Sequence, residues 1–116
     1  MKFMVKLDCS PYPNDVWFTT SINLYNRKRT EITGLTSDIG DMLGCVSTST
    51  SRMNNVIGVF DNSYYTLVHE IVHLVVNIAD SIGMDICTET TEPTAYLFES
   101  LYRQCVQHLI AFGEAV

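Results

Sequence analysis

The chain has 116 residues, of which 47% are hydrophobic and 17% are charged, and its formal net charge at pH 7 is −6. This length fits one compact domain, and this composition favours a folded globule over a disordered chain. The negative charge argues against nucleic acid or an anionic membrane surface as a partner. The longest apolar run, LVHEIVHLVVNIA, is too short and too polar to span a bilayer. We therefore expect a cytoplasmic protein that binds neither nucleic acid nor membrane.

The first third of the chain is predicted to form two strands and a helix. The alternation in KFMVKLD (2–8) and the residue types in DVWFTT (15–20) are typical of strands. The next segment, 19–34, has the features of a short helix, with Ser21 suited to its N-cap and Gly34 to its end.

The middle of the chain is predicted to add two more strands. A loop at 35–41 leads to MLGCVSTS (42–49), and NVIGVF (55–60) follows a polar turn. Together with the first two strands, these segments would build a small mixed sheet of about four strands.

Two longer helices are predicted in the C-terminal half. The first, 61–83, has apolar residues at helical spacing, with Asp61 or Ser63 as its cap. The second, 92–113, has a proline in its first turn and Gly113 at its end. The fold class expected is therefore α+β, in a single domain over residues 1–116: a mixed sheet with one short helix, followed by two packed C-terminal helices.

The four cysteines, at positions 9, 45, 87 and 105, are widely spaced and form no CxxC pair. This spacing favours isolated thiols over disulfides or a cysteine metal site.

The segment HEIVH is the strongest functional signal. Residues four apart on a helix lie on one face, so His69 and His73 can direct two imidazole nitrogens at one metal ion. Glu70, beside His69, is suited to act as general base on a water bound to that metal. The alternative interpretation is a pair of core histidines with no metal.

A catalytic zinc site needs a third protein ligand as well as an open position. Glu92 begins an ExxA pattern at the start of the last helix, which is expected to pack antiparallel to the HEIVH helix. A glutamate in its first turn could face His69 and His73, and the small Ala95 would allow close approach of the helices. Glu89, just before this helix, remains an alternative ligand.

HEIVH on one helix and ExxA on the next resemble the gluzincin metallopeptidases. The run EPTAYLFESL also resembles the corresponding region of the ImmA/IrrE-type minimal peptidases, and the chain is similar to small phage-encoded metallopeptidases. The specific resemblance covers residues 54–102. It implies a minimal zincin-like domain in which zinc is held by His69, His73 and Glu92, and in which Glu70 is the base of peptide-bond hydrolysis.

The resemblance also implies a substrate-binding edge on the strand before the HEIVH helix. Extended peptide would pair with NVIGVF at Val56, Gly58 and Phe60, and the glycine would let the substrate backbone approach closely. Related families carry Asn or Asp four residues after the glutamate ligand, whereas this chain has Tyr96, so the residue that orients a ligating histidine is an open question; Asp80 and Asp85 are the other candidates.

Two further functions stay open. The chain could be a catalytically silent, zinc-containing interaction or assembly module that retains a metallopeptidase fold. It could also be a specific protease that needs a protein partner to complete its site, because it lacks the second lobe with which many peptidases close their cleft.

Overall fold

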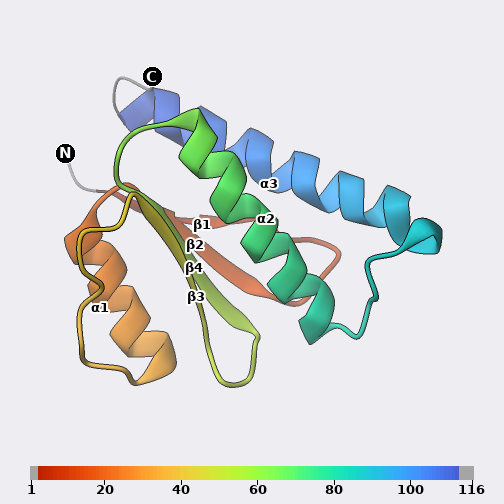
Figure 1. The fold of residues 1–116 in the computed structure, drawn as a ribbon, viewed down its shortest axis with the longest axis horizontal. Coiled ribbons are helices and arrows are strands. Elements are labelled where there is room, and N and C mark those ends of the chain that lie inside the picture. Colours follow the sequence, from red (N-terminus) through yellow and green to blue (C-terminus); the bar gives the residue numbers. More distant parts are fainter. Residues whose placement is uncertain (1–2, 113–116) are drawn as a thin grey trace.

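The computed structural model describes residues 3–112, and in this part of the chain the fold is α+β, as predicted (Figure 1). The strands are β1 (Met4–Leu7), β2 (Asp15–Thr19), β3 (Gly44–Thr48) and β4 (Asn54–Val59). The helices are α1 (Ile22–Thr33), α2 (Tyr64–Ser81), the short 3-10 helix η1 (Thr88–Thr90) and α3 (Thr91–Phe112). The predicted helix end at Gly113 lies outside the described residues.

The four strands form one mixed sheet in the order β1-β2-β4-β3. β1 pairs antiparallel with β2, β2 pairs parallel with β4, and β4 pairs antiparallel with β3. β4 is therefore an interior strand with a partner on each side, and β3 lies at an edge of the described sheet.

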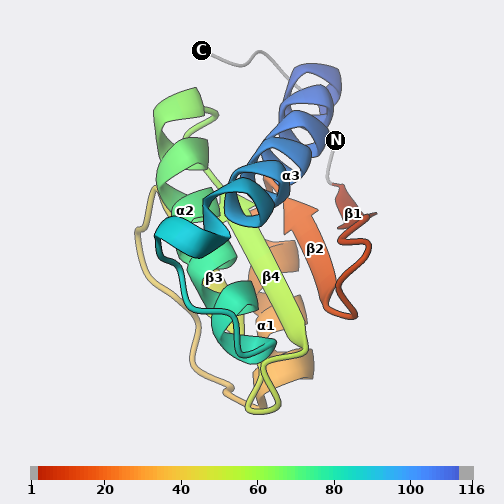
Figure 2. The same cartoon turned by 90° about the vertical axis from the view of Figure 1, so that its right-hand side faces the viewer.

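Helices cover both faces of this sheet, as two views at right angles show (Figures 1 and 2). Alternate residues of β4 point to opposite faces. Ile57 and Val59 belong to the main core, which includes residues of α2 and α3, whereas Gly58 points toward Tyr25 of α1. The fold is thus α1 on one face, the sheet in the middle, and α2 with α3 on the other face.

The helix ends follow the local signals in the sequence. The Ser21 hydroxyl accepts a hydrogen bond from the Leu24 N–H at 3.3 Å, so Ser21 is the N-cap of α1. Gly34 adopts a left-handed conformation (φ 76°) and ends that helix. Of the two candidate caps of α2, Ser63 is the N-cap, and its hydroxyl accepts from the Tyr65 N–H at 3.2 Å.

α2 supplies much of the main core. Leu67, Ile71, Leu74 and Ile78 recur at helical spacing and are fully buried in this core, which also contains Leu101 of α3. None of the described helices combines the length and the apolar character that crossing a membrane requires.

Candidate metal and catalytic site

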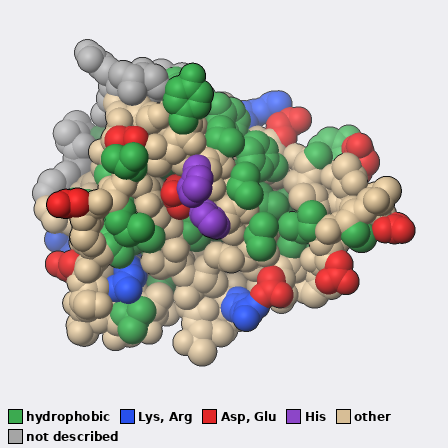
Figure 3. Space-filling view, in the orientation of Figure 1, with side chains coloured by type: hydrophobic (Ala, Val, Ile, Leu, Met, Phe, Trp, Pro, Cys, Tyr) green, Lys and Arg blue, Asp and Glu red, His purple; other side chains and the backbone are tan. Residues whose placement is uncertain are grey.

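The two histidines of HEIVH lie on the solvent-facing side of α2. The side chain of His69 is 69% exposed, and His73 is also exposed. Their ring centroids are 5.0 Å apart, and the ring planes are inclined by 73°. Figure 3 shows histidine side chains on the open face, beside a carboxylate and bordered by hydrophobic side chains. The alternative of two core histidines is therefore wrong.

Glu70 lies beside this pair but is buried. The residue is 7% exposed, and its Oε2 atom lies 3.9 Å from Nε2 of His69. Burial, which disfavours the charged carboxylate, raises the pKa of Glu70, while the neighbouring His69 and His73 act in the opposite direction. The arrangement places a desolvated carboxylate next to two accessible imidazoles, which suits a proton acceptor.

The burial of Glu70 depends on a glycine in the edge strand. A Cβ atom on Gly44, the first residue of β3, would lie 2.9 Å from Cγ of Glu70 and 2.6 Å from Cγ2 of Thr66. A side chain there would force its neighbours to shift, so its absence lets α2 approach β3 closely. Further along the helix, Asn77 Nδ2 donates a hydrogen bond to the Thr48 hydroxyl at 3.0 Å, which fixes the other end of β3 against α2.

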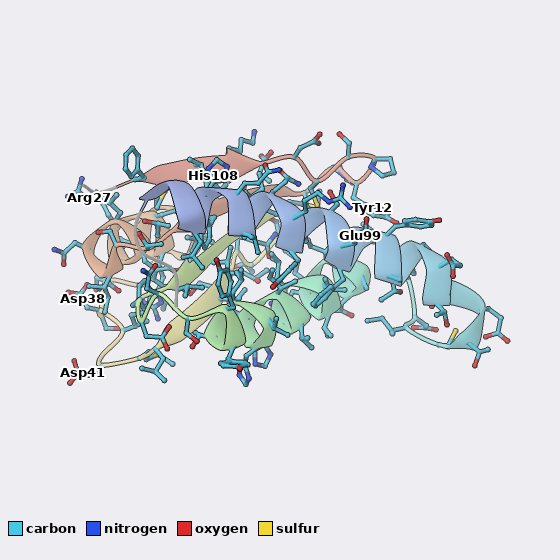
Figure 4. The ribbon with its side chains drawn as sticks, turned by 90° about the horizontal axis from the view of Figure 1, so that it is seen from above. Tyr12, Arg27, Asp38, Asp41, Glu99 and His108 are labelled. Carbon is cyan, nitrogen blue, oxygen red and sulfur yellow. The ribbon has the colours of Figure 1, made fainter. Side chains whose placement is uncertain are left out.

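A pocket of about 510 Å³ opens between α2 and the start of β3. Its walls are residues 41–44 on one side and Tyr65, Thr66, His69 and Glu70 on the other. Figure 4 shows the side chain of Asp41 at the end of the molecule, and this exposed acid forms part of the outer wall of the pocket. The pocket gives solvent and small groups access to His69 and Glu70.

The structure does not bring Glu92 together with the two histidines. Glu92 is exposed in the first turn of α3. α3 approaches α2 along the flank formed by Val72 and Val76, where Thr91 and Ala95 line the shared groove, whereas Glu70 lies on the flank that faces β3. In the part of the chain that the structure describes, no three His, Cys, Asp or Glu side chains are grouped closely enough to hold a metal ion.

The other acidic candidates have different surroundings. Glu89 is exposed in η1, and hydrogen bonds from the Cys87 thiol and from the backbone lower its pKa. Asp80 forms an ion pair with Arg52, and Asp85 is exposed after the end of α2.

Tyr96 does not orient a histidine ligand. It is 67% exposed on α3 and lines a separate pocket with residues of the β1–β2 turn, among them Tyr12. Its predicted supporting role at the metal site is therefore not what this structure shows.

The predicted substrate-binding edge is wrong, because β4 is paired on both sides. Val56 is fully buried, and the ring of Phe60 packs edge-on against Tyr25 with centroids 5.4 Å apart. A Cβ atom on Gly58 would lie 2.4 Å from Cζ of Phe60, so this glycine makes room for the aromatic rings between β4 and α1 rather than for a substrate. The strand with an open edge beside the histidines is β3.

The residues present fit zinc by type but not by number. Imidazole nitrogens are among the ligands that zinc prefers, and His69 and His73 are adjacent and accessible. A protein zinc site has three or four protein ligands, and the described residues bring two together.

Gly44 is a residue of the site that was not predicted from the sequence. A glycine inside or at the start of a strand often marks a close approach of another chain segment, and this signal was present in MLGCVSTS.

Comparison of the chain with models of known protein families, with curated proteins and with solved structures finds no match.

Proposed function

We propose that the protein is a zinc-dependent metallopeptidase in which His69 and His73 bind the metal and Glu70 is the general base. The observation that carries the proposal is a buried carboxylate 3.9 Å from one of two adjacent, exposed imidazoles, in a pocket at the edge of a sheet. A surface helix has no structural need for this combination, because burying a carboxylate without a paired cation costs stability.

Bound zinc would supply a Lewis acid that polarises a carbonyl group and lowers the pKa of water. The two imidazoles would hold and orient it on α2. Glu70 would accept a proton from the attacking water and then deliver it to the leaving amine, a task for which a raised pKa is suitable.

The proposed substrate is an extended peptide segment of a protein. The outer edge of β3 is open in the described sheet, and the pocket beside it contains His69 and Glu70. A peptide that added to β3 as a further strand would gain main-chain hydrogen bonds and would run past the histidines. We place this reaction in the cytoplasm, and in the host cytoplasm if the chain is phage-encoded.

One observation is compatible with two other functions. The described residues bring two rather than three ligands together, which is compatible with a catalytically silent, zinc-containing interaction or assembly module. It is equally compatible with a peptidase whose site is completed by a protein partner.

The test combines metal analysis with cleavage. Purified full-length protein, loaded with Zn²⁺ and freed of excess metal, should retain zinc, and the His69→Ala and His73→Ala variants should lose it. With partner and substrate proteins from the same genome present, the wild type should generate new peptide termini detectable by mass spectrometry, and Glu70→Gln should not. Glu99→Gln is the matched control, because Glu99 is an exposed carboxylate of α3 that pairs with Arg103.

Equal cleavage by the wild type and Glu70→Gln would overturn the assignment of the base. Zinc retention without any cleavage at either low or high protein concentration, in the presence of those partners, would favour the interaction module.

A further inference from the structure

The outward face of α2 carries several exposed apolar and aromatic side chains. Tyr65, Val68, Val72 and Val76 are 89%, 39%, 49% and 48% exposed. Their spacing of three and four residues places them along one stripe, together with His69 and His73. We call these six residues the α2 stripe.

The α2 stripe carries no formal charge. Between residues 64 and 79 the only Asp, Glu, Lys or Arg is Glu70, which is buried on the flank facing β3. Contiguous exposed apolar side chains often mark a surface that binds a partner. Figure 3 shows hydrophobic side chains next to the histidines on this open face of the molecule.

The second observation concerns the number of metal ligands. His69 and His73 are two nitrogen donors, and the described residues add no further ligand beside them. Zinc in proteins prefers four ligands in a tetrahedral arrangement. A twofold axis through the ion would double two histidines to four.

We propose that the protein forms a symmetric dimer in which two copies of the α2 stripe pack together and share one zinc ion, held by His69 and His73 of each copy. This inference rests on the metal-binding part of the proposed function, but not on peptide hydrolysis.

The α2 stripe suits a second copy of this chain better than an unrelated protein. A twofold interface brings the same patch of both subunits together, so the patch must be complementary to itself. An uncharged apolar stripe meets that condition, and helices that pack with axes about 8–10 Å apart bring side chains of both into contact with one ion. Each chain has a net charge of −6, which opposes association, and a shared Zn²⁺ offsets that repulsion locally.

The shared site would also control the proposed reaction. Four imidazoles fill the tetrahedral sphere, so no position is left for a substrate or water. The partner helix would also cover the neighbouring pocket that contains Glu70. The dimer is then the resting form, and the monomer, with two ligand positions filled, is the form that can accept substrate.

The experiment is a Zn²⁺ titration of the metal-free, full-length chain, followed by sedimentation velocity and by metal analysis of each species. We expect the mass to rise from 13.1 kDa to twice that value, with half an equivalent of zinc per chain, and to return on addition of EDTA. His73→Ala should remain monomeric. His108→Ala is the matched control and should dimerise like the wild type, because His108, the only other histidine of the sequence, lies on α3 (Figure 4).

A variant that keeps both histidines separates the dimer from the metal site. Val76→Lys places a charge in the α2 stripe without adding a carboxylate ligand, and it should bind zinc while staying monomeric at concentrations at which the wild type is fully dimeric.

The outcomes distinguish the two proposals. A monomer that retains one zinc per chain would overturn the shared site and leave the metal site of the proposed function intact. A chain that retains no zinc would overturn both. A dimer that forms equally well with EDTA, or with His73→Ala, would overturn the shared metal ion.

Discussion

Gly44 and Glu70 are in such close contact that a single added carbon at residue 44 would come within 2.9 Å of the Glu70 side chain. β3 and α2 are therefore in contact at Gly44, where β3 has no side chain. The position of the proposed base is set by this contact.

Gly44→Ala should destabilise the protein by about 1–3 kcal/mol, because the new methyl group overpacks the contact with Thr66 and Glu70. The variant should also shift Glu70 away from His69 and reduce any cleavage that depends on Glu70. Urea unfolding measures the first effect. Gly40→Ala is the control, since a Cβ there meets no atom within 4 Å, and it should change the free energy of unfolding by less than about 0.5 kcal/mol. Equal stability of the two variants would contradict the close contact.

Gly58→Ala should destabilise the protein by a similar amount, about 1–3 kcal/mol, through the other face of the sheet. Its Cβ would lie 2.4 Å from Cζ of Phe60 and 2.8 Å from Cδ2 of Tyr25. Replacing the aromatic ring by the smaller leucine side chain in Phe60→Leu should relieve the clash. A double-mutant cycle of Gly58→Ala and Phe60→Leu should therefore give a favourable coupling of about 0.5–3 kcal/mol. Additive effects in that cycle would mean that the two residues do not share this space.

Glu70→Gln should make the metal-free protein more stable near neutral pH. Burial raises the pKa of Glu70 above its ordinary value of 4.5, so the folded state holds this proton more tightly than the unfolded state. The stability that this provides is fully present below about pH 4.5 and is lost as the pH rises through the folded pKa. Glutamine has no such loss, so the stability difference in favour of the variant should open as the pH increases above 4.5.

Thermal unfolding between pH 4 and pH 8, in the presence of a chelator, measures this difference. A wild type that remains at least as stable as Glu70→Gln over the whole range would contradict the desolvation of Glu70. Glu99→Gln should show no comparable gain, because Glu99 is exposed.

The rate at which each cysteine is alkylated should increase with its exposure. All four cysteines lie in the described part of the chain as free thiols, with Cys87 exposed and Cys9 and Cys105 buried. Burial, together with the charges of Asp8 and Asp15, raises the pKa of Cys9 to about 11, so at pH 8 about one molecule in a thousand carries its thiolate. Iodoacetamide at pH 8 should therefore modify Cys87 first and leave Cys9 and Cys105 unmodified, as read by peptide mass spectrometry, and all four should react in denaturant. Early modification of Cys9 in the folded protein would contradict its packing.

The local structure could be predicted because its signals are local. Ser21, Gly34 and Ser63 sit at the helix ends that their capping preferences predict, and the strand segments follow from alternation and residue type. The same holds for the placement of His69 and His73 on one face of the helix, since a spacing of four residues fixes that relationship by itself.

The arrangement of the strands and helices could not be predicted, because it depends on contacts between distant segments. Nothing within NVIGVF indicates that β2 and β3 flank it on either side. The resemblance to metallopeptidases implied an edge strand, whereas β4 lies in the interior of the sheet. Likewise, the spacing between His73 and Glu92 gives the length of the connection but not the flank of α2 on which α3 packs. α3 lies on the flank that carries Val75, which is buried in one core with Leu97 and Leu101 of α3.

The parallel pairing of β2 with β4 divides the sheet between two separate stretches of chain, since β1 and β2 come before α1 and both of the other strands come after it. During synthesis on the ribosome, β2 emerges with one side unpaired, and its intended neighbour appears only after α1 and β3 have been made. An unpaired strand edge is a template for pairing with other chains. The nascent chain should thus be most prone to aggregation before residues 54–59 leave the ribosomal exit tunnel.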